Sequence, residues 1–289
     1  MIFGLGAALG WGLSDLWAAF SGRRIGSGRT VVIAQVAAAI AVSLLVLLVR
    51  PDLSGIPEVA PWVVPNAFLG AAAFASLYKG LQLGPIAVVS PVLATYAVVP
   101  VLLSMVLLGE SLGAWQVVGA VVTIAGAVLT STDLRSLKTG TRTKPAGLPW
   151  AIVSTVLFGV ATYIMGWSAQ TAGVLPALWF GKLTMMAVFL GSALVVAIRR
   201  RSAGEADPAP LVRSALALAV AVGLVELVGT ISYAWGAEVG LLSIVTVASA
   251  TYPLIPVIGG VAVLQERPAP TQYLGVTMVI GGLLLLGLA

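Results

Sequence analysis

Apolar residues run along the chain in long segments that are separated by short turns rich in Gly, Pro and charged residues. A helix needs about 20 mainly apolar residues to cross the hydrocarbon core of a bilayer. Segments of this kind recur at roughly 2–20, 30–49, 61–82, 85–108, 112–131, 148–168, 174–198, 211–234, 240–264 and 271–288. The pattern therefore predicts an all-α integral membrane protein with ten transmembrane helices.

The composition supports this prediction. Hydrophobic residues make up 60% of the chain and charged residues only 9%, whereas soluble domains carry about 25% charged residues. The first apolar segment follows no basic stretch and contains no clear cleavage site, so we expect a retained span rather than a signal peptide. With no Cys and no His, the chain lacks thiolate metal ligands and the usual proton shuttle, and we expect no metal and no cofactor.

Two segments, 94–129 and 250–285, repeat each other without a gap at an offset of 156 positions. Identical residues include Tyr96 and Tyr252, Pro100 and Pro256, Glu110 and Glu266, Gln116 and Gln272, and Gly126 and Gly282. Apolar sequences give chance matches at Ala, Val and Leu, but they do not readily align Tyr, Pro, Glu and Gln in order. The repeat predicts a duplicated membrane unit, which is the usual construction of secondary transporters.

The polar connection 132–147 divides the chain into a first half, 1–131, and a second half, 148–289, with five predicted spans each. Because the number of spans per half is odd, the second half is inverted relative to the first. Of the 15 Lys and Arg residues, all but Arg50 and Lys182 fall on one side of this arrangement. The positive-inside rule makes that side cytoplasmic and places both termini outside. The basic residues thus reflect topology, and we expect no nucleic-acid partner.

The repeated segment also carries a family resemblance. Its residues are Pro91, Ala94-Thr95-Tyr96, Pro100, Leu108-Gly109-Glu110, Gln116, Gly119 and Gly126, with a weaker copy at 247–282 in which Val247 replaces Pro91 and Leu264-Gln265-Glu266 replaces the LGE triplet. Together with Gly10-Trp11-Gly12 in the first span, they resemble the drug/metabolite transporter superfamily in its ten-helix EamA-type branch. The resemblance implies an exporter of amino acids, some of them aromatic, or of other small metabolites.

Three charged residues lie near the middle of predicted spans: Asp15, Lys182 and Glu226. A charge in the hydrocarbon region costs about 2.5–3.5 kcal/mol even on insertion scales, so such residues normally face a cavity or each other. One interpretation is a substrate or proton site, in which Asp15 binds an ammonium group and Lys182 a carboxylate. The other is a buried ion pair that fixes packing. Two acids against one Lys leave one carboxylate unpaired, which suits proton coupling.

Polar and aromatic residues extend this candidate site. Aligning Gly12 with Gly159, at an offset of 147, places Gln35 opposite Lys182, and solute sites of inverted repeats lie near the symmetry axis; Gln35 can equally hydrogen-bond another helix. Tyr96 and Tyr252 are equivalent in the repeat, and either line the path or bond a neighbouring helix. Trp11, Ser14 and Asp15 share one helical face.

Prolines and acidic residues mark the ends of the repeated segments. Pro91, Pro100, Pro253 and Pro256 interrupt the fourth and ninth spans and predict either static kinks or hinges. Glu110 and Glu266 precede the fifth and tenth spans, where we expect them to favour the helix dipole, with gating as the alternative. Glycines such as Gly119, Gly126, Gly275 and Gly282 predict close helix packing.

These patterns predict a monomeric secondary transporter that exports small organic metabolites, most directly amino acids, across the bacterial inner membrane by alternating access. Its partners would be the solute, protons on Asp15 or Glu226, and the lipid bilayer. The absence of a G-x-x-x-x-G-K-[ST] motif argues against an ATPase. Nucleosides, sugars and cationic drugs remain alternative solutes. A channel or a membrane enzyme is less compatible with a chain that has neither polar stripes nor a visible catalytic constellation.

Overall fold

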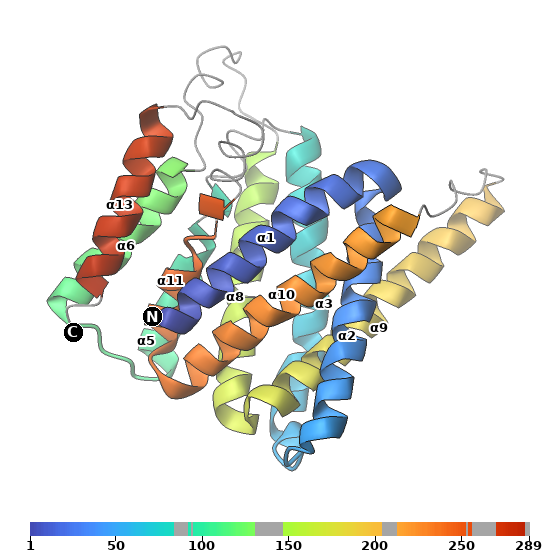
Figure 1. Ribbon diagram of the computed structural model, residues 1–289, viewed down its shortest axis with the longest axis horizontal. Coiled ribbons are helices and arrows are strands. Elements are labelled where there is room, and N and C mark those ends of the chain that lie inside the picture. The colour runs from blue at the N-terminus through green and yellow to red at the C-terminus, as the bar shows by residue number, and fades with distance from the viewer. Residues whose placement is uncertain are drawn as a thin grey trace.

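The computed structural model describes residues 1–83, 92–93, 95–130, 147–203, 213–252, 254–255 and 270–286. The described residues form helices and turns, with no strand among them. The elements in Figure 1 are α1 (Ile2–Ile25), α2 (Ser27–Val49), α3 (Ile56–Leu83), η1 (Thr95–Ala97), α5 (Val98–Leu107), α6 (Ala114–Thr130), α8 (Leu148–Ala172), α9 (Val174–Ser202), α10 (Arg213–Val239), α11 (Leu242–Ser249) and α13 (Pro270–Leu286). The predicted all-α class is confirmed.

Within the described part of the chain, 6 helices are long and apolar enough to cross a membrane, namely α1, α2, α3, α8, α9 and α10. Shorter apolar helices cover Thr95–Leu107, Ala114–Leu129 and Tyr273–Leu286. Eight predicted spans therefore correspond to one helix each, while the fourth and ninth correspond to the short helices that begin at Thr95 and Leu242.

The helices extend further than the apolar segments suggested. α3 begins at Ile56 rather than at 61. The early start is compatible with Pro57, because proline suits the first turn of a helix, where backbone N–H groups have no partner within the helix. Pro61 and Pro65 lie inside the helix. α9 continues to Ser202 and includes the three arginines of its last turn. Cations there lie favourably at the negative end of the helix dipole.

The fourth and ninth spans are interrupted, as the prolines suggested, but Pro100 does not cause the interruption. Pro100 lies in the first turn of α5 and is buried, a position where its missing N–H removes no bond. The helical path changes just before it, in the 3-10 turn Thr95–Ala97. In the ninth span α11 ends at Ser249 and a turn follows through Tyr252. Pro91, Pro253 and Pro256 lie outside the described residues.

The two halves interlock rather than forming separate bundles. α1 of the first half packs along α10 of the second, and α3 of the first packs along α8 of the second. If each helix is replaced by its equivalent in the other half, the pair α1–α10 becomes α3–α8, and the pair α2–α10 becomes α3–α9. The pairs α2–α9, α5–α11 and α6–α13 are unchanged by the same replacement. This pairing is what a pseudo-two-fold axis between the halves requires.

Glycine contacts support the same alignment in atomic detail. A Cβ atom on Gly12 would lie 2.8 Å from the carbonyl oxygen of Tyr252, and a Cβ atom on Gly159 would lie 2.8 Å from that of Tyr96. Gly12 and Gly159 are related by the offset of 147, and the two tyrosines by the offset of 156. Each half thus packs its first helix against the broken span of the other half, at a distance that only glycine allows.

The pair α6–α13 shows why these helices carry glycine. A Cβ on Gly119 would come within 2.7 Å of the Gly282 carbonyl oxygen, and one on Gly126 within 2.7 Å of the Val279 nitrogen. Apolar side chains gain nothing from leaving lipid, so small residues associate helices by letting backbones approach closely. The predicted packing role of these glycines is confirmed.

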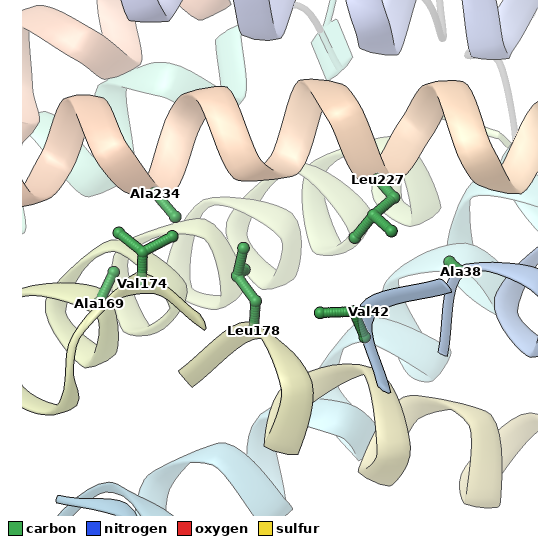
Figure 2. Packing of buried hydrophobic residues seen from close by; sticks show 7 residues of the cluster. All are labelled: Ala38, Val42, Ala169, Val174, Leu178, Leu227 and Ala234. Atoms are coloured by element: carbon green, nitrogen blue, oxygen red, sulfur yellow. The ribbon is translucent and has the colours of Figure 1, made fainter. Parts of the chain in front are cut away.

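A buried apolar cluster joins α2, α8, α9 and α10 (Figure 2). It consists of Ala38, Val42, Ala169, Val174, Leu178, Leu227 and Ala234, each at most 5% exposed. The α8–α9 connection at Gly173 has a positive φ of 82°, which glycine adopts without strain. That turn brings Ala169 and Val174 into the same cluster.

The ends of the described helices separate the basic residues as expected. In Figure 1 the end of α1, the end of α9 and the start of α10 lie at the upper edge, and they carry Arg24, Arg199 to Arg201 and Arg213. The start of α1 and the end of α13 lie at the lower edge. That the basic edge faces the cytoplasm remains a prediction from charge.

Glu110 connects the halves at the start of α11 in a way the sequence did not predict. Its carboxylate accepts hydrogen bonds from the backbone N–H groups of Leu242 (2.6 Å) and Ser243 (3.0 Å) and from the Ser243 hydroxyl (2.6 Å). The expected interaction with a helix N-terminus is present, but the helix is α11 of the opposite half and not α6, which follows Glu110. Glu266 lies outside the described residues.

We expect Glu110→Gln to lower the free energy of unfolding by about 1–3 kcal/mol, because charge-assisted hydrogen bonds to three donors are lost or weakened. Glu58→Gln, at an exposed acid in the first turn of α3, is the matched control and should change stability by less than about 0.5 kcal/mol. Thermal unfolding in detergent compares the two variants. Equal melting temperatures would contradict the connecting role of Glu110.

Candidate functional site

A cavity of about 310 Å³ lies within the bundle, lined by residues of both halves. Its volume is at the lower end of the range of small-molecule sites. Polar or charged lining residues are Trp11, Ser14, Asp15, Gln35, Asn66, Tyr96, Thr162, Ser168, Lys182, Glu226, Thr230 and Tyr252. The wall contains all eight residues predicted for solute binding or coupling, whereas Pro100, the one predicted hinge proline within the described residues, is not part of it.

Lys182 and Glu226 form an ion pair across this cavity wall. The Lys182 Nζ lies 2.5 Å from the Glu226 Oε2, and the side chains are 10% and 25% exposed. Lys182 comes from α9 and Glu226 from the neighbouring α10, so both belong to the second half. Removing one partner of a buried ion pair destabilises a folded protein by roughly 3–5 kcal/mol. This cost explains why an apolar bundle that contains Lys182 also contains Glu226.

The second oxygen of Glu226 is also engaged. The Thr230 hydroxyl lies 2.7 Å from the Glu226 Oε1 and also receives the indole N–H of Trp11 at 3.2 Å. Because Thr230 follows Glu226 by four residues, the two share one face of α10. Trp11 of α1 thereby joins the network, so the ion pair is connected to the first half through a hydroxyl.

Asp15 is the acid left over. It lines the cavity and is exposed to it, and no ion pair joins it to another described residue. Of the three charged residues of the wall, Lys182 compensates Glu226, so the described wall carries one net negative charge. The predicted imbalance of charge is present, and the structure assigns the unpaired carboxylate to Asp15 rather than to Glu226.

Aromatic rings face this charged region. Tyr96 and Tyr252 approach each other with ring centroids 6.2 Å apart and planes at 54°, as equivalent residues near a two-fold axis would. The Tyr96 hydroxyl also lies 3.2 Å from the Ser249 hydroxyl. Tyr96 therefore both lines the cavity and bonds a neighbouring helix. Trp11 packs on Tyr233 with centroids 5.4 Å apart.

Ser14 and Gln35 complete the predicted set. The Ser14 hydroxyl donates to the Val222 carbonyl oxygen at 3.3 Å, so it ties α1 to α10 as well as lining the cavity. Gln35 lies on α2, which packs against the α9 helix of Lys182. The sequence-equivalent pair Gln35 and Lys182 thus reaches one cavity from two helices that the pseudo-symmetry relates.

Sequence reasoning missed several residues of the wall. Asn66 of α3 donates its side-chain N–H to the Ala161 carbonyl oxygen at 3.2 Å. It was recognisable in the sequence as a polar amide inside the third predicted span. Thr230 was recognisable from its spacing to Glu226. Apolar members had no signal, because Phe74, Phe158, Met165 and Met185 look like any lipid-facing or core residue in sequence.

The arrangement can bind a small solute that carries charge. The carboxylate of Asp15 and the ammonium group of Lys182 offer ionic and hydrogen-bonding contacts. The rings of Tyr96 and Tyr252 offer stacking contacts in a site of low polarity.

Comparisons with known proteins agree with the fold. A solved structure described as "Crystal structure of protein" is similar over 98% of this chain and 94% of that chain, with a TM-score of 0.78 and 20% identity, a level that shows the fold alone. No significant match is found among curated proteins. The model of the EamA-like transporter family matches residues 1–132 and 145–288, one copy in each half. The chain is therefore a multi-pass membrane protein that belongs to the EamA-like transporter family.

Proposed function

We propose that this protein exports amino acids across the inner membrane of a bacterium by alternating access between two inverted halves of five helices each. Family membership supports transport of small solutes in general. The observation that carries the proposal further is the cavity between the halves, whose wall holds an uncompensated acid and a shared cation. Charged residues inside a membrane domain mark solute or ion paths by default.

The charges of the wall suit a zwitterion. Asp15 would receive the solute's ammonium group, and Lys182 would receive its carboxylate. The two residues come from different halves, α1 and α9, so a solute held by both would contact both moving parts. The rings of Tyr96, Tyr252 and Phe158 would cover an apolar or aromatic side chain.

Binding a carboxylate at Lys182 requires a rearrangement of the ion pair. Lys182 already donates to Glu226 at 2.5 Å, so a solute carboxylate would share or replace that bond. Glu226 would keep the Thr230 hydroxyl as a donor at its other oxygen. Exchange of one carboxylate for another conserves the charge around Lys182 and avoids leaving the cation unpaired.

Proton coupling is assigned to Asp15 within this proposal. A carboxylate that lacks a cationic partner in an apolar bundle gains most from taking up a proton. Proton and solute ammonium would then compete for one group. Glu226, the other candidate from sequence, already accepts hydrogen bonds from Lys182 and Thr230.

A second class of solute is favoured by one observation. The described wall has one net negative charge, which also suits an organic cation without a carboxylate. Such a solute would engage Asp15 and leave the ion pair intact. The transport experiment must therefore include cations beside amino acids.

The direct test is counterflow into proteoliposomes loaded with unlabelled solute, using labelled aromatic and aliphatic amino acids and organic cations at two pH values. Saturable exchange of amino acids, with a dependence on pH, is the expected result. Saturable exchange of cations alone would replace the first proposal by the second. No exchange with any of these solutes would reject both.

Changing Lys182 alone and together with Glu226 separates the structural role of Lys182 from its role in solute recognition. Lys182→Met should lower the free energy of unfolding by about 3–5 kcal/mol, because it leaves the Glu226 charge unpaired. The double variant Lys182→Met with Glu226→Gln restores neutrality, so most of this stability should return. Amino acid exchange should remain at least about tenfold below wild type in the double variant, because one charge-assisted contact is lost. Recovery of exchange together with stability would make Lys182 purely structural.

Asp15→Asn should remove the pH dependence of exchange, because the proton-binding group is gone. Its effect on melting should be small, because Asp15 has no ionic partner among the described residues. Counterflow rates measured across a pH series give the comparison, with Asp52→Asn in the exposed α2–α3 turn as the control. An Asp15→Asn protein that keeps the wild-type pH profile would exclude Asp15 as the coupling group.

A further inference from the structure

Three buried side-chain atoms in the described part of the chain have no hydrogen-bond partner: the Gln35 Oε1, the Asn66 Oδ1 and the Thr123 Oγ1. Leaving a polar atom buried and unpaired is unfavourable, and native structures contain few such atoms. Two of the three belong to residues that line the cavity, while Thr123 lies in the α6–α13 pair away from it. The cavity therefore concentrates unpaired acceptors.

The two amide oxygens are buried and lack a donor in the described part of the chain. Asn66 uses its N–H group on the Ala161 carbonyl oxygen, which leaves only its oxygen for another partner. Gln35 makes no hydrogen bond within the described part of the chain, and its terminal torsion is soft. A small rotation can therefore turn its oxygen toward the cavity.

Several donors of the wall are engaged with partners other than these two oxygens. Lys182 and Thr230 donate to Glu226, and Trp11 donates to Thr230. Three further hydroxyls of the wall donate to backbone carbonyl oxygens: Ser14 to Val222, Thr162 to Phe158 and Ser168 to Ile164. The two amide oxygens thus remain without a donor from the described part of the protein, so a solute that offers N–H groups would complement them.

The two amides and Asp15 come from one half of the molecule. Asp15, Gln35 and Asn66 lie on α1, α2 and α3 of the first half, whereas Lys182 and Glu226 lie on α9 and α10 of the second. α9 packs against both α2 and α3, so the helices that carry the two amides flank the helix of the lysine. The acceptors of the first half and the cation of the second half therefore come from neighbouring helices.

We infer that Gln35 and Asn66 act with Asp15 as specificity residues that recognise the N–H donors of a primary ammonium group on the solute. A primary ammonium has three donors, and the first half offers three acceptor groups. A quaternary ammonium has the same charge and no donor, so it would leave both amide oxygens unpaired. The inference rests on the proposed function, because it requires that the cavity bind an amine.

A competing account predicts the opposite preference. If Trp11, Tyr96 and Tyr252 bound the cation through their ring faces, a quaternary ammonium would bind as well as a primary one or better. Charge attraction to Asp15 alone would not distinguish the two. Discrimination between a primary amine and its trimethylated form therefore reports on hydrogen bonding specifically.

The test measures binding of L-phenylalanine, L-leucine and the N,N,N-trimethyl derivative of each to the purified full-length protein. In the wild type the primary amines should bind at least about a hundredfold more tightly, the effect of two hydrogen bonds of ordinary strength. Gln35→Met and Asn66→Leu should each reduce that ratio by about tenfold. Thr123→Val removes the third unpaired atom, away from the cavity, and should leave the ratio unchanged.

Each other result overturns the inference. If all three variants merely melt at higher temperature and keep the wild-type ratio, the amide oxygens are packing defects and not recognition groups. Equal or tighter binding of the trimethyl derivatives to wild type would favour the rings instead, while the proposed transport of amines would stand. If neither amino acid nor derivative binds the wild-type protein, the proposed function fails for these solutes, and this inference fails with it.

Discussion

The ion pair between Lys182 and Glu226 is the constraint on which the rest of the site depends. A membrane bundle tolerates a cation at its centre only with a partner, and the partner must itself be held: Glu226 is anchored by Thr230, which accepts from Trp11 of the opposite half. This chain of contacts fixes α9, α10 and α1 around one cavity. It also decides the charge of the cavity, because once Lys182 and Glu226 compensate each other, Asp15 remains as the free acid.

The interlocked halves explain how such a site can be built without a soluble core. Each half places its first helix against the broken span of the other, through Gly12 and Gly159, and its third helix against the other's first helix. Small residues let these backbones approach, since lipid offers no hydrophobic gain for helix association. Glu110 adds a polar contact between the halves at the N-terminus of α11. A cavity between such halves is bounded by both, so relative motion of the halves would change its access.

Much of this architecture was predictable from the sequence, and the limits have physical causes. The length and spacing of apolar segments predict helices, and the ordered repeat of Tyr, Pro, Glu and Gln predicts a symmetry with which the Gly12 and Gly159 contacts are consistent. Charges stand out in apolar spans, so Asp15, Lys182 and Glu226 were identifiable as cavity residues. Which acid pairs with Lys182 depends on the packing of α9 against α10, which no spacing along the chain encodes. For the same reason Glu110 was assigned to the helix that follows it rather than to α11, and Phe158 or Met165 could not be distinguished from lipid-facing residues.

The central claim is that the cavity is a water-reachable solute site between the halves, and substituted-cysteine labelling tests it most directly. The chain has no cysteine, so Thr162→Cys introduces a single thiol on the cavity wall, where the native hydroxyl bonds only its own helix. Val156→Cys, at a 46% exposed apolar position of the same helix, is the lipid-facing control. In proteoliposomes a charged, membrane-impermeant thiol reagent should label Thr162→Cys and not Val156→Cys, because thiols in apolar surroundings stay protonated and unreactive. The transported solute should slow that labelling in a saturable way. A Thr162→Cys thiol that is unreactive from both sides of the membrane, or that reacts at the same rate with saturating solute, would contradict the account.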